Sequence, residues 1–458
     1  MKKWHIFISV FLCLSAIHAQ PQTWSEIHEG HLFLGNDSLK VVLVTSTEGD
    51  TLTAVMDSPD QYINDIPVTS IRFIGDTLRL EVASIGATFR GTVCGDTIRG
   101  KFRQYGRALP LTLKPTQERL IFRRPQEPRR PFPYQEIELT FSHKDGEPPT
   151  CGTLTLPPHK PYATIVLISG SGWQDRNESV CGHQPFLVLA DSLTRCGYAV
   201  FRYDDAPVHR FNHLTTYDFA EQVGVIMDTL SRRPELQGLP LGLLGHSEGS
   251  MVAFIAGAAH QPDFIISLAG VGTSMREVLL YQTMTLGAES HWEEGLLRNS
   301  LLINDRIYRL IEKSKHPDKE KKEIKKFLQR YTADMTDAMR QQLHLTDIEI
   351  NAICSTVTSD WFFAVMHLNI SQYIRKIQCP VLVLNGDKDA QVDGVQNIHA
   401  IISQLPHPEQ AHGQLLEGLN HLFQECETGH PDEYGKIEQT LSPLLLRTVA
   451  QWLEHLKK

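Results

Sequence analysis

The sequence lacks the local patterns that mark metal sites, disulfide frameworks and nucleic-acid surfaces. No C-x-x-C and no H-E-x-x-H motif occurs among its 8 cysteines and 21 histidines, so we expect neither a zinc site nor a cross-linked scaffold. The formal net charge is -9 at pH 7, and no basic stripe with interleaved aromatic residues can be read along the chain. We therefore expect no metal, no organic cofactor and no nucleic-acid partner.

Long apolar runs are scarce as well, and the exception lies at the start of the chain. The basic pair Lys2-Lys3 precedes an apolar run at 6–17, and Ala19 follows it. This order is typical of a signal peptide at 1–19 that is cleaved after Ala19. The run is too short to span a bilayer comfortably, so we expect a periplasmic or extracellular protein with no membrane span after cleavage. An uncleaved anchor is the alternative.

The first part of the mature chain, 22–121, lacks helical periodicity. It consists of short alternating runs such as 39–44 and 78–82, separated by turn residues such as Gly75-Asp76. This spacing predicts a small all-β domain, either a barrel or a sandwich, without a catalytic constellation. The Pro/Arg-rich stretch 122–134 follows, and its prolines predict an extended linker.

From residue 135 the pattern changes. Two strands at 135–141 and 151–156 are expected to join through a turn at 143–146. After them come continuous apolar runs separated by helical stretches, which predict a parallel α/β sheet covered on both faces; the runs are 164–168, 199–203, 241–244, 264–268 and 380–385. Residues 274–374 contain several helices and no clear strand, so this insertion in the domain 135–458 is predicted to form a helical cap.

The motif Gly245-His246-Ser247-Glu248-Gly249 lies between an apolar strand and a helical run. This is the context in which G-x-S-x-G forms a nucleophile elbow. Small flanking residues are needed because the turn is sharp and strained. The motif therefore predicts Ser247 as a nucleophile, with the backbone N–H of Glu248 at a helix N-terminus as an oxyanion donor.

A serine nucleophile needs a base, and the base needs an orienting acid. Asp389 follows an apolar strand and His421 lies in a short later segment, which gives the chain order Ser, Asp, His of α/β-hydrolases. Asp387 and Asp393 are alternatives for the acid. The histidines that compete with His421 lie beside proline or in polar stretches; they are His407, His412 and His430.

Several motifs resemble those of α/β-hydrolases, specifically bacterial exported esterases of the serine-aminopeptidase-like group with an N-terminal β domain; these are 56–61, 170–176, 202–205, 245–249, 385–389 and 418–424. The resemblance implies that Asp389 is the acid and that His421 is the base. It also implies that a second oxyanion donor comes from Ser171 or Gly172. The loop 206–210 departs from the pattern, which leaves the substrate preference open.

The cap is expected to lie over Ser247 and to line the acyl pocket with Trp361 and Phe362, while Trp173 forms another wall. The resulting prediction is an exported serine hydrolase that cleaves small carboxylic esters through a Ser-His-Asp triad. A peptidase or amidase with the same triad is the alternative. A non-catalytic protein that binds glycan or peptide is the alternative of another class.

Overall fold

The computed structural model describes residues 26–34, 37–49, 51–104, 106–142, 149–205, 213–290 and 292–457. The predicted signal peptide, the turn at 143–146 and the loop at 206–210 lie outside the described residues. The chain separates into two compact units, Met1–Ile121 and Phe122–Lys458. Each unit has a hydrophobic core of its own.

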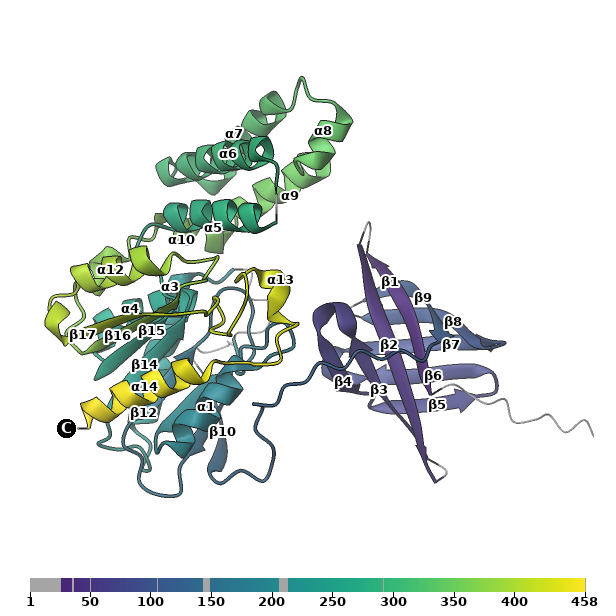
Figure 1. The fold of residues 1–458 in the computed structure, drawn as a ribbon, viewed down its shortest axis with the longest axis horizontal. Helices are drawn as coiled ribbons and strands as arrows, with labels where there is room; N and C mark the ends of the chain where they lie inside the picture. The colour runs from purple at the N-terminus through teal and green to yellow at the C-terminus, as the bar shows by residue number, and fades with distance from the viewer. Residues whose placement is uncertain are drawn as a thin grey trace, which may run out of the picture. The chain divides into compact units, whose positions relative to one another are not determined.

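The N-terminal unit is an antiparallel sheet (Figure 1). Its order in the described chain is β4-β3-β2-β1-β9-β8-β7-β6-β5, so its two edge strands follow one another in sequence. The elements are β1 (Ile27–Leu34), β2 (Asp37–Glu48), β3 (Thr51–Ser58), η1 (Pro59–Gln61), β4 (Ile63–Pro67), β5 (Ser70–Ile74), β6 (Thr77–Val82), η2 (Ala83–Ile85), β7 (Ala87–Cys94), β8 (Thr97–Gln104) and β9 (Arg107–Pro115).

Alternation of side chains explains why this unit has one core. In β6, for example, Leu78, Leu80 and Val82 are buried and join inward-facing residues of β1, β2, β3, β7, β8 and β9 in one cluster, as expected for strands of period two. The prediction of an all-β unit is confirmed. Its form is a single curved sheet, an open half-barrel, rather than two packed sheets.

The stretch 122–134 contains no helix or strand, but it is not a free linker. The Arg124 guanidinium donates hydrogen bonds to the carbonyl oxygens of Gly182 (3.0 Å), Gly435 (2.8 Å) and Ile437 (3.0 Å). The side-chain N–H of Gln126 donates a hydrogen bond to the carbonyl oxygen of Leu441, at 2.6 Å. Sequence composition indicated the extended form and missed these anchors, which make the stretch part of the second unit.

The second unit contains a mixed sheet in the order β10-β11-β13-β12-β14-β15-β16-β17. β10 and β11 are antiparallel to their neighbours, and the remaining strands are parallel. The strands are β10 (Gln135–Phe141), β11 (Thr150–Leu156), β12 (Thr164–Ile168), β13 (Ala199–Tyr203), β14 (Leu241–His246), β15 (Phe264–Leu268), β16 (Val381–Gly386) and β17 (Ala411–Leu416). The prediction of a mostly parallel α/β sheet is confirmed.

Helices cover both faces of this sheet (Figure 1). α1 and α14 pack on one face, and α3, α4 and α12 pack on the other. Their apolar stripes bury the continuous hydrophobic runs of the strands. The helices and turns outside the cap are α1 (Pro185–Arg195), α3 (Thr216–Ser231), α4 (Glu248–His260), α12 (Gly394–Gln404), η3 (Pro408–Gln410), α13 (Pro431–Tyr434) and α14 (Pro443–Leu456).

The insertion between β15 and β16 consists of helices joined by short turns and loops, and its described residues include no strand. It has its own buried cluster, which includes Ile311, Ile324 and Leu328, and the charged run around Lys319 lies mostly on its exposed surface. Its helices are α5 (Met275–Glu289), α6 (Glu294–Lys313), α7 (Pro317–Tyr331), α8 (Asp337–Gln342), α9 (Asp347–Val357), α10 (Asp360–His367) and α11 (Ser371–Ile374).

Candidate active site

Ser247 lies at a strained turn between β14 and α4. Its φ is 52° and its ψ is −118°, a backbone conformation that residues other than glycine rarely adopt. The flanking glycines are required by close approach, because a Cβ on Gly245 would lie 2.1 Å from the Gly249 carbonyl oxygen. A Cβ on Gly249 would lie 2.1 Å from the carbonyl oxygen of Ile168. The strain that G-x-S-x-G predicts is therefore present, and it presents Ser247 at the carboxyl edge of the sheet.

Asp389 and His421 meet at the same edge. His421 Nδ1 lies 2.8 Å from Asp389 Oδ2, and both side chains are buried. The other oxygen of Asp389 accepts the backbone N–H groups of Gln391 at 2.8 Å and Val392 at 2.9 Å. These donors hold the carboxylate against one ring nitrogen, which leaves Nε2 of the imidazole as the atom available for proton transfer.

The alternative acids have other partners. Asp387 Oδ1 accepts the Gly418 N–H at 2.6 Å, and Asp393 caps α12 by accepting the Gln396 N–H at 3.0 Å. The competing histidines also have other surroundings. His407 pairs with Gln378 and Glu409, His430 caps α13, and His412 is exposed on β17.

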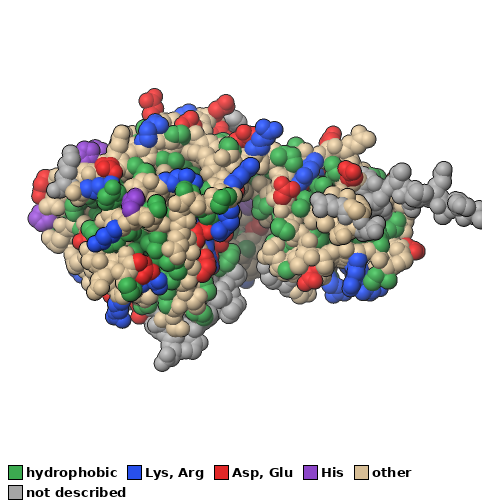
Figure 2. Space-filling model, turned by 90° about the horizontal axis from the view of Figure 1, so that it is seen from below, with side chains coloured by type: hydrophobic (Ala, Val, Ile, Leu, Met, Phe, Trp, Pro, Cys, Tyr) green, Lys and Arg blue, Asp and Glu red, His purple; other side chains and the backbone are tan. Residues whose placement is uncertain are grey.

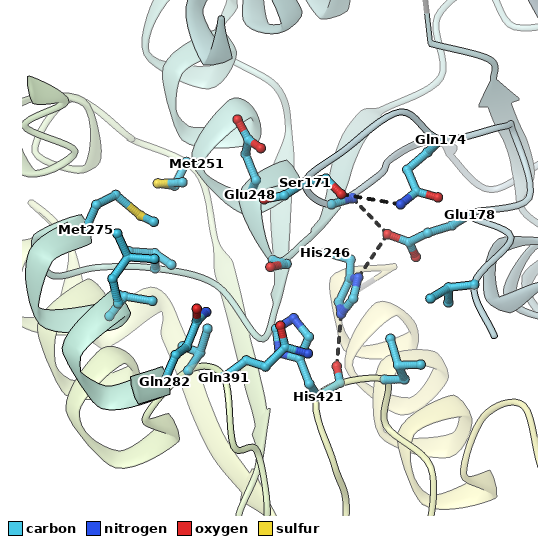
Figure 3. Close-up of a pocket in the computed structure, with 18 of the residues that line it drawn as sticks. Ser171, Gln174, Glu178, His246, Glu248, Met251, Met275, Gln282, Gln391 and His421 are labelled. Atoms are coloured by element: carbon cyan, nitrogen blue, oxygen red, sulfur yellow. Dashed lines mark hydrogen bonds and ion pairs between the residues drawn. The ribbon is translucent and has the colours of Figure 1, made fainter. Parts of the chain in front are cut away.

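A cavity of about 300 Å³ opens between Ser247, His421 and the cap. Figure 3 shows Met251 and Met275 on one side and Gln282 and Gln391 beside His421. The apolar part of the wall comes from α4, the loop after β15, the cap and the loop after β16; it includes Met251, Val271, Met275, Val278, Leu279, Trp361 and Val392. The cavity is therefore apolar on one side and carries neutral amides near the imidazole.

The loop after β12 passes beside the nucleophile. A Cβ built on Gly170 would lie 3.3 Å from the Cβ of Ser247, and the next residue, Ser171, lines the cavity. Gly172 has a φ of 88° and is not among the described lining residues. Glu248 is the first residue of α4, where a backbone N–H has no intrahelical acceptor. The arrangement brings Ser171 and Glu248 near Ser247 and favours Ser171 over Gly172.

The carboxylate of Glu248 is buried. Its Oε1 accepts hydrogen bonds from Thr216 Oγ1 at 2.7 Å and from the Trp361 indole at 2.8 Å. Burial raises the pKa of Glu248, and the hydrogen bonds from Thr216, Trp361 and Ser171 offset part of this rise. The residue after the nucleophile thus connects α4 to α3 and to the cap.

A second buried pair, Glu178 and His246, was not predicted from the sequence. His246 Nδ1 lies 2.9 Å from Glu178 Oε1, and its Nε2 lies 2.9 Å from the carbonyl oxygen of His421. The same Glu178 oxygen accepts the Gly170 N–H at 2.8 Å. Figure 3 shows this chain of bonds from the loop after β12 to the His421 backbone. One carboxylate therefore connects the three segments that carry the candidate catalytic groups.

The His246 ring has an acceptor at each nitrogen, an arrangement that favours the doubly protonated ring. Burial lowers the pKa of His246, but the charge and hydrogen bond of Glu178 and the carbonyl of His421 outweigh it and raise the pKa above its ordinary value. The signal for this pair was weak, because 68 positions separate the two residues and only His246 lies in a motif.

The three expected pocket residues have different environments. Trp361 lines the cavity. Phe362 is buried in the cap cluster, with its ring centroid 6.2 Å from that of Tyr308. Trp173 is 46% exposed, and neither it nor Phe362 is among the described residues that line the cavity. Neighbouring residues on α10 point to different sides, so only one of the two can reach the cavity.

The cap is also hydrogen-bonded to the loop after β16, which carries Asp389. Tyr281 on α5 donates to the carbonyl oxygen of Asp389 at 2.9 Å, and Thr285 donates to that of Ala390 at 2.6 Å.

In the described ranges no group of three or more His, Cys, Asp or Glu side chains is arranged to hold a metal ion. None of the described helices combines the length and apolarity that a membrane span requires.

Comparison with known proteins agrees with this arrangement. No family model matches the chain. Among curated proteins, Esterase EstD of Thermotoga maritima is 21% identical over 330 residues, which cover 70% of this chain and 68% of that esterase. This likeness extends over more than two thirds of each protein.

Solved structures of several hydrolases match the chain as well, with TM-scores of 0.40 to 0.41. They include a carboxyl esterase from Bacillus coagulans (17% identity, TM-score 0.41, covering 70% of this chain and 99% of that one). Est1E from Butyrivibrio proteoclasticus with ferulic acid has 13% identity and a TM-score of 0.41, covering 70% and 100%. A proline iminopeptidase from Mycobacterium smegmatis has 14% identity and a TM-score of 0.40, covering 70% and 99%.

Proposed function

We propose that this protein is a serine hydrolase that cleaves carboxylic esters through an acyl-enzyme intermediate. Ser247 Oγ attacks the ester carbonyl carbon while His421 Nε2 takes its proton. The same proton passes to the departing alkoxide, and a water molecule deprotonated by His421 then releases the acid. Asp389 orients the ring and stabilises the imidazolium. The observation that carries the proposal is the strained Ser247 at a cavity that the Asp389–His421 pair also reaches.

The developing oxyanion needs donors that are fixed before the reaction. The proposed donors are the backbone N–H groups of Glu248 and Ser171. The first stands at the N-terminus of α4, where the helix dipole favours negative charge. The second lies on the loop that the Gly170–Glu178 hydrogen bond of 2.8 Å fixes beside Ser247.

The carboxylates that line the cavity already have partners, which favours esters over aminopeptidase substrates. Two carboxylates, Glu178 and Glu248, are among the described lining residues. The first is paired with His246, and the second accepts bonds from Thr216 and Trp361. A substrate α-ammonium group would need an unengaged carboxylate, because a buried unpaired charge is costly. The neutral wall fits an uncharged ester better.

Purified full-length protein, assayed on p-nitrophenyl acetate and on aminoacyl-p-nitroanilides, tests the reaction class. We expect turnover of the ester and little of the anilide, together with labelling of Ser247 by a fluorophosphonate probe. Ser247→Ala and His421→Ala should each lower kcat by on the order of 10⁴ or more, without adding in the double variant. If either variant retains more than about a tenth of the activity, far outside that range, the assignment fails.

Export also belongs to the proposal. The order of the basic pair at 2–3, the apolar run at 6–17 and Ala19 supports a cleaved signal. N-terminal sequencing of the protein recovered from a secreting host should begin at Gln20. Recovery of an intact Met1 in the membrane fraction would instead indicate the uncleaved anchor.

A further inference from the structure

Four basic residues form one row across the outer face of the N-terminal sheet. Arg72 of β5 lies opposite Arg79 of β6, Arg79 lies opposite Arg90 of β7, and Arg90 lies opposite Lys101 of β8. Neighbouring strands are about 4.8 Å apart, so the row extends over roughly 14 Å. The sequence contains no run of basic residues that would indicate this row, because its four members come from four strands. The strand register alone brings them together.

Two further cations flank the row on β8. Side chains alternate along each strand, so Arg99 and Arg103 share the outer face with Lys101. Among the outward-facing residues of β5 to β8, Glu81 is the one that carries a carboxylate. Figure 2 also shows Lys and Arg side chains gathered on this unit. In a chain with a net charge of -9, this face is locally cationic.

The row is not neutralised within the described part of the unit. The ion pairs found there join Lys40 to Glu29, and Arg119 to Asp57 and Asp65. Like charges directly opposite one another destabilise a sheet, and here three such pairs follow in succession. An external anion would supply the missing negative charge.

The other outward positions indicate which anion. They are mostly hydroxyl side chains and include no aromatic residue; they are Ser70, Ile74, Thr77, Thr88, Thr92, Cys94 and Thr97. A lipid surface is usually bound with apolar side chains that insert below the headgroups, and single-stranded nucleic acid with aromatic side chains that stack on bases. A face of guanidinium and hydroxyl groups matches a chain of carboxylates and hydroxyls.

We propose that this face, defined by Arg72, Arg79, Arg90, Arg99, Lys101 and Arg103, binds a linear acidic polysaccharide, with its carboxylates over the cationic row. The guanidinium groups bind carboxylates in a fork geometry, and the threonine hydroxyls bond the sugar hydroxyls. The unit then holds the protein on an anionic glycan, independently of the reaction at Ser247. The inference goes beyond the proposed function and does not depend on it.

Binding of polygalacturonate by the full chain carrying Ser247→Ala tests this site without hydrolysis. We expect binding at low ionic strength that weakens as salt rises, and no binding of uncharged dextran. Arg79→Gln with Arg90→Gln should weaken binding by about tenfold or more, because two of the cations that face the carboxylates are lost. Lys322→Gln with Lys326→Gln, on the exposed surface of α7, changes the net charge equally and should leave the affinity within about twofold.

A thermal melt separates loss of the site from loss of the fold. The Arg79/Arg90 variant should unfold no earlier than the parent, because it removes like-charge repulsion. If it fails to fold, Arg72→Gln with Lys101→Gln at the two ends of the row gives the same test. The inference is overturned if polygalacturonate does not bind, or if neither pair changes the affinity. Tighter binding to phosphatidylglycerol vesicles or to a single-stranded DNA oligomer through the same residues would also overturn it.

Discussion

At the scale of single residues, the acid that serves His421 is chosen by hydrogen bonding. Asp389 bonds His421 Nδ1 at 2.8 Å, whereas Asp387 bonds the Gly418 N–H. Asp389→Asn should lower kcat by roughly 10⁴, because the amide favours the wrong imidazole tautomer. Asp387→Asn should lower kcat less than tenfold. Steady-state kinetics on p-nitrophenyl acetate decides, and equal losses or the reverse order would move the role away from Asp389.

Glu178 is predicted to act by positioning. Its charge lets the His246 ring donate from both nitrogens, to Glu178 and to the carbonyl of His421. With Glu178→Gln the neutral ring keeps one N–H and the amide offers one oxygen, so the bonds to the Gly170 N–H, to His246 Nδ1 and from His246 Nε2 to the His421 carbonyl cannot all be kept. Small displacements of catalytic groups are costly, and we expect kcat to fall by roughly 10- to 100-fold while KM changes less than about threefold.

Thr155→Val is the stability control for this variant. Thr155 Oγ1 forms a buried hydrogen bond of 2.6 Å with Thr194 Oγ1, and neither residue lines the cavity. The control should lower the melting temperature and leave kcat nearly unchanged. His246→Gln, which retains an N–H donor, should keep more activity than His246→Phe. If Glu178→Gln loses stability only, with kcat unchanged, the pair is structural.

At the scale of elements, apolar runs made the buried strands predictable. The run 164–168 became β12, and 380–385 overlaps β16, because both lie inside a sheet covered on two faces. β17 was not predicted, because this edge strand reads Ala-His-Gly-Gln-Leu-Leu and is largely exposed. Local composition describes a central strand well, and an edge strand depends on the neighbour it pairs with.

The same limit applies to the sites. Ser247, Asp389 and His421 each lie in a short local motif, so they could be recognised one at a time. The Glu178–His246 pair and the cationic row could not, because they depend on contacts between distant segments. The row in particular exists only in the observed register, and a slip of one residue in any strand would turn its cation into the core.

The cap contributes one further prediction at this scale. Trp361 lines the cavity, and Phe362 packs in the cap cluster. Trp361→Ala should therefore change kcat/KM differently for acetate and octanoate esters, by about 1–3 kcal/mol between them. Phe362→Ala should lower stability, by about 3–5 kcal/mol if the cap unfolds with the unit, and change both esters alike.

Matched p-nitrophenyl esters and thermal melts of the two variants provide the measurements. An equal change for all chain lengths with Trp361→Ala would show that the cap does not select the acyl group. A chain-length effect confined to Phe362→Ala would restore that residue to the pocket and contradict its placement in the cap cluster.

At the scale of the whole molecule, two separate cores predict that the second unit can be produced alone. The cluster of the N-terminal sheet contains no residue beyond Leu113, and the clusters of the α/β unit begin at Leu139. The sequence would place the boundary of an active fragment at Gln135, after the proline-rich stretch. The structure places it at Phe122, because Arg124 and Gln126 bond backbone groups of the second unit.

We therefore expect a chain that starts at Phe122 to fold and to hydrolyse p-nitrophenyl acetate within about threefold of the full chain, in line with the small effects of changes that leave the site intact. A chain that starts at Gln135 leaves the carbonyls of Gly182, Gly435 and Ile437 without their donor. A hydrogen bond to a charged group contributes about 1.5–3 kcal/mol, so this shorter chain should melt several degrees lower. Arg124→Ala in the full chain should reproduce part of that shift. Equal melting temperatures for the two fragments would show that the stretch is a tether after all, and an unfolded Phe122 fragment would show that the two cores are not independent.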